Sequence, residues 1–106
     1  MALSRSNLIT FGFLADAATM PLHWIYNQAD IEAKVADGTS AIFYPTPSCP
    51  FYNYPKGVLS PYGDESLPLL RSIAREHRFE FEKVCEEYHS FFSVYGSEEG
   101  KGYAGR

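Results

Sequence analysis

The stretch from Ser4 to Met20 places the strongest constraint on the fold, because it reads as a helix with apolar residues on nearly every side. A helix of that kind is expected to be buried, since none of its faces is suited to water. Ser4 or Ser6 is placed to cap its first turn. Pro21 limits the other end, because proline disfavours a helical residue before it.

A second, shorter helix is expected from Gln28 to Ala36, with Asn27 as its cap and Gly38 as its terminator.

The following segment, residues 39–61, is irregular and holds most of the chain's seven prolines together with five aromatic residues. So long a loop is uncommon in a compact domain, and its aromatic rings predict that it packs over something. Two interpretations stay open: the segment builds a binding site, or it only covers the core.

The pattern becomes helical again after Gly63, with Pro68 placed in the first turn, where its missing N–H does no harm. The strongest helical period lies between Phe79 and Tyr95, and Gly96 is expected to stop that helix. Its aromatic residues are interpreted as core and its acids as a solvated face. The tail 97–106 reads as a linker or an incomplete loop. No convincing strand pair appears, so an all-α fold is expected, and the 106 residues should form one domain or part of one.

Composition disfavours several classes of function. Thirteen acidic residues against nine basic ones give a net charge of −4, opposite in sign to that of a nucleic-acid binder. No stretch predicts a membrane span or a cleaved leader, so a cytoplasmic protein is expected.

Cys49 and Cys85 lack metal or redox spacing and are expected to be reduced and structural. His77 and His89 lack zinc spacing and are expected to be solvated or half-buried.

Two acidic positions are the candidates for chemistry. Asp16 lies in the middle of the apolar helix, where a carboxylate must find donors, and His23 and Trp24 follow closely. Asp16 either caps a neighbouring loop from within the core or belongs to a functional site.

The run Tyr62–Ser66 places two adjacent carboxylates and a hydroxyl at a helix start, which suits Mg²⁺ or Ca²⁺. The same residue types also cap a helix, so both roles stay open.

Taken in order, the run Gly12–Trp24, the Pro/Tyr-rich loop and the run Tyr62–Ser66 resemble the ADP-ribosylglycohydrolase superfamily, and above all its J1-crystallin-like branch. The resemblance implies an orthogonal all-α bundle that holds two Mg²⁺ ions and hydrolyses the glycosidic bond of ADP-ribose. It extends over nearly the whole chain but matches only the beginning of the family's domain. Residues 1–106 are therefore expected to be the N-terminal portion of a single domain whose C-terminal part is absent.

The family's first motif commonly reads Gly-Asp-Ala-x-Gly-x-Pro-x-Glu. Asp16 and Pro21 match it, whereas both glycines are replaced and the acid that is catalytic in some members falls on His23. Histidine can move protons near neutral pH, but it has no negative charge with which to polarise a water. By this resemblance, Asp16 and His23 are the candidate catalytic residues, and Trp24 and Tyr62 are the candidate substrate-binding residues.

The family's second motif reads Thr-Asp-Asp-Thr, and here it is Gly63-Asp64-Glu65-Ser66. The resemblance makes Asp64, Glu65 and Ser66 the candidate Mg²⁺ ligands, with one hydroxyl ligand lost and one acid lengthened. The family's remaining ligands lie on a downstream Asp-x-Asp-Thr motif that this chain does not contain. Because Mg²⁺ demands near-octahedral coordination, the site is expected to be incomplete and the chain alone inactive.

The leading interpretation is a truncated ADP-ribosylglycohydrolase-like protein, whose full-length relative would be a Mg²⁺-dependent hydrolase of ADP-ribosyl N- or O-glycosidic bonds. Its expected partner is ADP-ribose or an ADP-ribosylated substrate. The alternative is a non-catalytic, crystallin-like structural protein with a decayed site. A third interpretation is a stand-alone binding module that uses the aromatic loop as a peptide or nucleotide surface, in which case replacing Tyr52 or Tyr54 with alanine should abolish binding. Self-association is expected if the apolar face around Phe91 and Phe92 stays uncovered.

Overall fold

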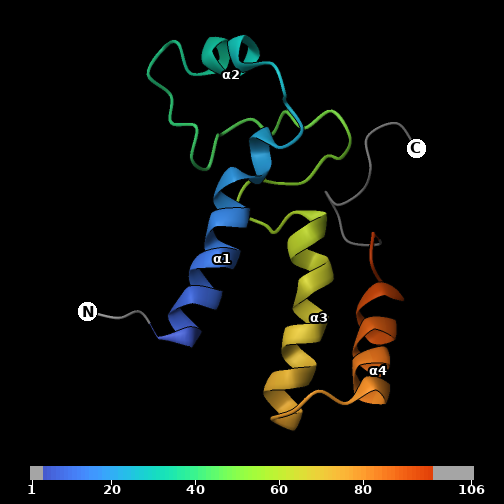
Figure 1. Ribbon diagram of the computed structural model, residues 1–106. Helices are drawn as coiled ribbons and strands as arrows, with labels where there is room; N and C mark the ends of the chain where they lie inside the picture. The colour runs from blue at the N-terminus through green and yellow to red at the C-terminus, as the bar shows by residue number, and fades with distance from the viewer. Residues whose placement is uncertain (1–3, 97–106) are drawn as a thin grey trace. The chain divides into compact units, whose positions relative to one another are not determined.

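The computed structural model describes residues 4–96, and these residues form helices without any strand. The prediction of an all-α chain is confirmed, while the predicted linker 97–106 lies outside the described residues. Contacts divide the chain between Ser60 and Pro61 into two compact units. None of the described helices is long and apolar enough to cross a membrane. The helices are α1 (Arg5–Thr19), the 3-10 helix η1 (Met20–Leu22), α2 (Gln28–Lys34), α3 (Pro61–Glu76) and α4 (Phe81–Phe92) (Figure 1).

Helix α1 begins where local capping predicts. The Ser4 hydroxyl oxygen accepts a hydrogen bond from the Asn7 N–H at 3.1 Å, and this satisfies a donor that the first turn leaves unpaired. At the other end the chain tightens into η1, which contains Pro21. The predicted helix and its Ser4 cap are therefore confirmed.

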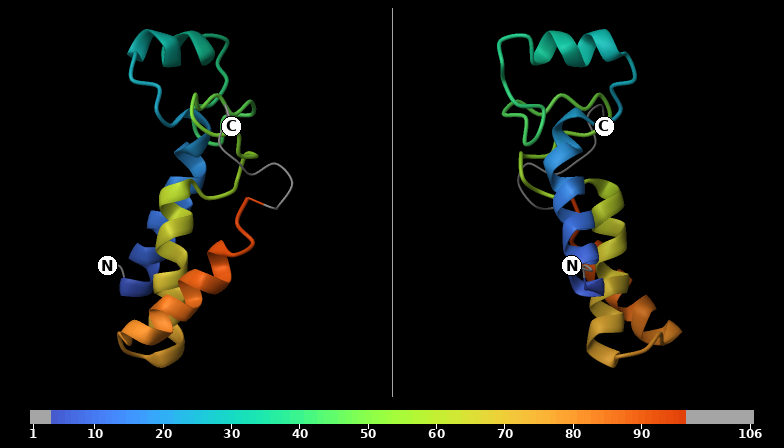
Figure 2. Two further views of the ribbon diagram at one scale, coloured as in Figure 1. Left: turned by 90° about the vertical axis from the view of Figure 1, so that its right-hand side faces the viewer. Right: turned by 60° about the vertical axis from the view of Figure 1, so that its left-hand side comes forward.

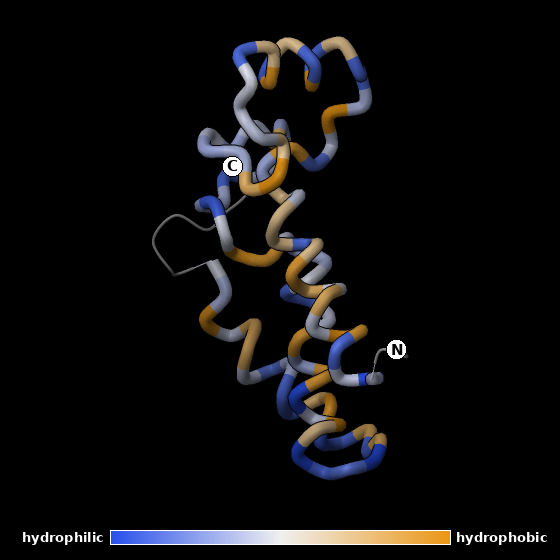
Figure 3. Tube along the Cα trace, turned by 90° about the vertical axis from the view of Figure 1, so that its left-hand side faces the viewer, coloured by the Kyte–Doolittle hydropathy of each residue, from blue (hydrophilic) through white to orange (hydrophobic). Residues whose placement is uncertain are grey.

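The predicted burial of α1 is wrong. Hydrophobic residues lie along most of the helix (Figure 3), yet only Ala17 and Ala18 are buried. Four large apolar side chains are between 44% and 55% exposed: Leu8, Ile9, Phe11 and Leu14. In the first unit the irregular segment 39–60 donates hydrogen bonds to the second half of α1, to η1 and to α2, none of which lies along the exposed first half of α1.

The irregular segment packs against that end through both backbone and side chains. The Phe43 N–H donates to the Ala18 carbonyl at 2.7 Å, and the Ser48 N–H donates to the Pro21 carbonyl at 2.8 Å. Tyr52 and Tyr54 are both buried, with their ring centroids 4.9 Å apart. The prediction that this segment packs over something is confirmed. Tyr52 and Tyr54 themselves belong to the core, whereas binding of a peptide or nucleotide by the aromatic loop stays a prediction.

Helix α2 is joined to the rest of the first unit by irregular segments on both sides (Figure 2). The Asn27 side chain accepts a hydrogen bond from the Ala29 N–H at 3.1 Å, so the predicted cap is confirmed. The helix ends at Lys34, slightly earlier than predicted. Gly38 lies in the turn that follows, with a φ of 86° that favours glycine and a hydrogen bond to the Val35 carbonyl.

Helix α3 starts earlier than predicted, at Pro61, and Pro68 lies inside it rather than in its first turn. Proline suits the first helical position, because its N–H would be unpaired there and its φ is already helical. Pro61 takes that place. The buried Pro68 removes a rung of the helix instead, since it has no N–H to donate to the Asp64 carbonyl.

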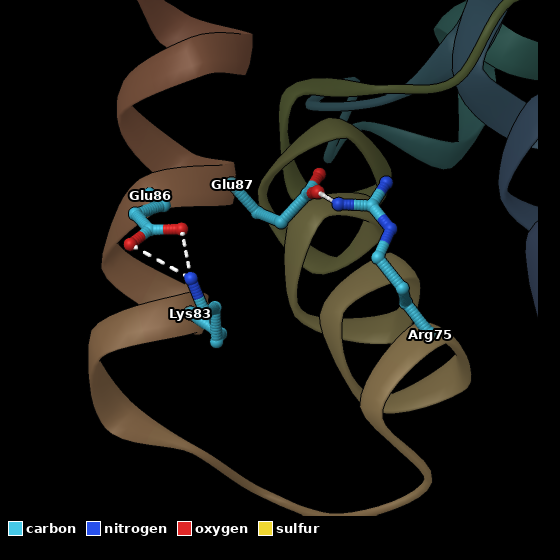
Figure 4. Close-up of polar contacts among 4 residues, drawn as sticks. All are labelled: Arg75, Lys83, Glu86 and Glu87. Atoms are coloured by element: carbon cyan, nitrogen blue, oxygen red, sulfur yellow. Dashed lines mark hydrogen bonds and ion pairs between the residues drawn. The ribbon is translucent and has the colours of Figure 1, made fainter.

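Helices α3 and α4 pack together in the second unit. Arg75 on α3 forms an ion pair with Glu87 on α4, and Lys83 lies against Glu86 along α4 (Figure 4). Hydrogen bonding to Glu86 raises the pKa of the Lys83 ammonium group above its usual value. The Arg71 guanidinium lies 5.8 Å from the centre of the Phe91 ring. An ion pair and a contact between a cation and an aromatic ring therefore join α3 to α4.

Helix α4 is shorter at both ends than predicted, and it ends before Gly96. The prediction that its aromatic stripe is core is too strong, because no residue of α4 is buried and Phe81 is largely exposed. The rings of Phe91, Phe92 and Tyr95 nevertheless contact one another, with centroids 4.9–5.8 Å apart. This arrangement is a half-buried aromatic cluster on one side of the helix pair.

The cysteines and the two remaining histidines have no shared site. Both cysteines are free, with Cys49 buried and Cys85 exposed on α4, so the predicted structural role fits only Cys49. A cysteine on the outer face of a helix contributes nothing to the core. His77 and His89 are exposed, as predicted for solvated side chains.

Candidate functional site

Asp16 holds the segment that leads into α3. Its Oδ2 accepts a hydrogen bond from the Ser60 N–H at 2.8 Å, and its Oδ1 accepts one from the Ser60 hydroxyl at 2.6 Å. Ser60 is fully buried and directly precedes Pro61, the first residue of α3. The structure thus shows the loop-capping role that the sequence left open for Asp16. Its role in catalysis stays a prediction.

His23 lies between two hydroxyl groups of the first unit. Its Nε2 is 3.0 Å from the Thr19 hydroxyl, and its Nδ1 is 2.9 Å from the Tyr52 hydroxyl. The Thr19 hydroxyl donates to the Ala15 carbonyl at 2.8 Å, so Nε2–H is assigned as the donor to Thr19. Nδ1 then accepts the proton of Tyr52. His23 therefore braces the end of α1, through Nε2, against the irregular segment, through Nδ1.

Replacing Tyr52 with phenylalanine tests this brace. The change leaves His23 Nδ1 without this donor in a part-buried position, so we expect the free energy of unfolding to fall by about 1 kcal/mol. Urea unfolding at equilibrium measures it. Tyr26→Phe is the matched control, because that side chain is 84% exposed. Equal stability of the two variants would contradict a bracing role for the Tyr52 hydroxyl.

Trp24 and Tyr62, the candidate substrate-binding residues, are both partly exposed and belong to different units. Trp24 has a φ of 64°, a left-handed conformation that bulky residues rarely adopt. Its ring contacts Tyr26 and Phe51, and it lines an open pocket of the first unit. Tyr62 lies in the first turn of α3, where its backbone carbonyl accepts the Ser66 hydroxyl at 2.9 Å.

The three candidate metal ligands differ in their surroundings. Asp64 is 2% exposed, and its Oδ2 accepts a hydrogen bond from the Tyr95 hydroxyl at 2.9 Å. Glu65 is exposed, and its backbone carbonyl accepts the Tyr88 hydroxyl at 2.6 Å. Ser66 is also exposed, and its hydroxyl donates back to the helix. One acid is therefore turned into the second unit, while its two neighbours face solvent.

A complete Mg²⁺ site does not follow from this arrangement. In residues 4–96, no group of three or more histidine, cysteine, aspartate or glutamate side chains is placed to hold a metal ion. Mg²⁺ needs oxygen ligands in near-octahedral geometry, whereas the carboxylates of Asp64 and Glu65 do not share one open face. The residues present do not fit the ion by themselves. Mg²⁺ binding stays a prediction that needs ligands from elsewhere.

The candidate residues fall into two groups, each described within its own unit. Asp16 and His23 belong to the first unit, together with Ser60 and Tyr52, and the run Asp64–Ser66 belongs to the second. The catalytic role of the first group and the metal-binding role of the second stay predictions.

Sequence reasoning did not identify the partners Ser60 and Tyr95. A hydroxyl residue directly before Pro61 signals a helix start, but nothing in the sequence links Tyr95 with Asp64.

Comparison with known proteins finds a distant similarity to J1 crystallins. The chain is 29% identical to crystallin J1A and 27% identical to crystallin J1B, both from Tripedalia cystophora, over 84 residues in each case. The match covers 79% of this chain and 26% of each relative, so the chain spans about a quarter of the length of these relatives. No family model matches the chain. No solved structure matches it significantly.

Proposed function

We propose that this chain is part of an ADP-ribosylglycohydrolase-related, crystallin J1-like protein, and that by itself it is an inactive helical portion. One observation carries the second half of the proposal. The carboxylates of both motifs accept hydrogen bonds within their own units: Asp16 from Ser60, and Asp64 from Tyr95. These acids therefore hold backbone and side chains in place.

The similarity supports the first half of the proposal. A match over 79% of the chain must include its middle, and with it the Asp64–Ser66 motif. Asp16 and Pro21 stand where the family's first motif has the same residues. His23 replaces an acid there, and both of its ring nitrogens are engaged with Thr19 and Tyr52. A general acid or base needs a nitrogen or oxygen within reach of the substrate, so this histidine would first have to give up a partner.

Hydrolysis by the chain itself is the direct test. We expect the 106-residue chain, given Mg²⁺ and peptides ADP-ribosylated on arginine or serine, to release no ADP-ribose above the buffer control, as measured by liquid chromatography with mass spectrometry. Calorimetry should likewise detect no saturable Mg²⁺ binding, because the described acids form no closed coordination set. Metal-dependent release that Asp64→Asn abolishes would overturn this proposal.

The second candidate function is Mg²⁺-dependent hydrolysis of ADP-ribosyl bonds by a longer protein that contains this chain. Asp64 favours it, because this buried carboxylate belongs to the run Gly63–Ser66, which resembles the family's metal-binding motif. Asp64→Asn in such a protein separates the two candidates. Lost activity with unchanged thermal stability would support the hydrolase. If the unmodified longer protein has no activity and Asp64→Asn lowers its thermal stability, a non-catalytic, crystallin-like structural protein would be supported.

A further inference from the structure

The first unit contains an open pocket of about 510 Å³ that the proposed function does not use. Its walls come from the turn after η1, from α2 and from the proline-rich segment, and they include Trp24, Tyr26, Asp30, Lys34 and Pro50. Pockets of this size hold a single small molecule, with apolar walls for contact and a few polar groups for orientation. Neither Asp16 nor the Asp64 motif lines it.

One wall of the pocket is aromatic. The Trp24 ring meets Tyr26 nearly at a right angle, at 85° and 6.0 Å between centroids, and it meets Phe51 at 73° and 5.2 Å. Its left-handed backbone is costly for a bulky residue, and such residues cluster where proteins clamp ligands. The Trp24 and Tyr26 rings stay accessible, so a flat or branched apolar group can pack against them.

The polar side of the pocket holds one acid and one base. Asp30 and Lys34 are four residues apart on α2 and therefore lie on the same face of the helix. Within residues 4–96 neither side chain takes part in an ion pair. Asp30 repels a purely anionic ligand and Lys34 repels a purely cationic one, whereas a molecule with both charges is complementary to the pair.

We propose that this pocket binds a small zwitterion, namely a free α-amino acid with an aromatic or branched apolar side chain. Its ammonium group pairs with Asp30 and its carboxylate with Lys34, while its side chain packs against Trp24 and Tyr26. The proposal goes beyond the proposed function and does not depend on it, because Asp30 and Lys34 have no role there, and Trp24 alone is shared with the candidate substrate-binding residues.

Fluorescence of Trp24 provides the readout, since it is the single tryptophan of the chain. We expect L-phenylalanine to change this fluorescence saturably. Phenylalaninamide, which lacks the carboxylate, and N-acetylphenylalanine, which lacks the ammonium group, should each bind roughly tenfold more weakly, because each loses one charge-assisted contact.

Variants assign each charge to its partner. Lys34→Gln should remove the preference for phenylalanine over its amide, and Asp30→Asn should remove the preference over the N-acetyl compound. Glu32→Gln is the matched control, because Glu32 lies on the same helix, outside the pocket, with a hydrogen bond to Gln28. Far-UV circular dichroism confirms that each variant keeps its helices.

Three kinds of outcome would overturn the proposal. The first is no saturable change in fluorescence with phenylalanine in the folded chain. The second is equal binding of phenylalanine and its amide, or an equal loss in Glu32→Gln and Asp30→Asn. The third is tighter binding of a neutral nucleoside without dependence on either charge, which would make the pocket a stacking surface only.

Discussion

Replacing Asp16 with alanine is expected to lower the free energy of unfolding by about 3 kcal/mol, because the buried Ser60 loses acceptors for both its N–H and its hydroxyl. A buried donor without a partner costs more than the hydrogen bond it once made was worth. Urea unfolding followed by near-UV circular dichroism measures the change. Ser60→Ala, which removes only the hydroxyl, should cost about 1 kcal/mol.

Asp16 and Ser60 also allow a double-mutant cycle. Once Ser60→Ala has removed the hydroxyl, Asp16→Ala should cost less than it does in the unmodified chain, because only the hydrogen bond from the N–H of residue 60 remains to be lost. Glu82→Ala is the control for removing an acid, since Glu82 is exposed on α4. A loss in Asp16→Ala no larger than the loss in Glu82→Ala would mean that Asp16 does not anchor Ser60 in solution.

Replacing Tyr54 with alanine is the second large effect that we expect. Tyr54 is 1% exposed and packs on Tyr52, so truncating it removes a buried ring and leaves a cavity. Such changes cost about 3–5 kcal/mol. Unfolding monitored by the fluorescence of Trp24 reports on the same unit.

Tyr26→Ala is the matched control, because the same truncation at an exposed ring should change stability by no more than about 0.5 kcal/mol. Similar losses in the two variants would show that the irregular segment does not pack on the end of α1 in solution. A selective loss in Tyr54→Ala would establish that the segment is part of the core of the first unit.

Contacts between residues close in sequence are the ones that sequence reasoning predicted correctly. Ser4 caps α1 and Asn27 caps α2 because a capping side chain reaches only two or three residues along the chain. The placement of Pro68 in the first turn of α3 was predicted wrongly, because Pro61 begins the helix. Both prolines suit a first helical turn, and Pro61 follows Ser60, which Asp16 holds from α1.

At the candidate site, too, the sequence indicated local features but not the distant partners. The sequence alone marked Asp16 as an acid that needs donors, and Asp64 as part of an acidic run that suits a metal ion or a helix cap. It did not indicate the partners, because Ser60 is 44 residues from Asp16 and Tyr95 is 31 residues from Asp64. Whether these acids also bind a substrate or a metal stays a prediction.

By itself, the sequence determined the all-α class, the helix caps and the two acidic motifs that resemble a known superfamily, because these depend on residue types and local spacing. The tertiary structure alone decided that most of the large side chains of α1 are exposed, that Tyr52 and Tyr54 are core, and that Asp16 and Asp64 are used as hydrogen-bond acceptors. The physical reason is that a periodic pattern shows which face of a helix is apolar, whereas burial and pairing depend on which distant segment covers that face.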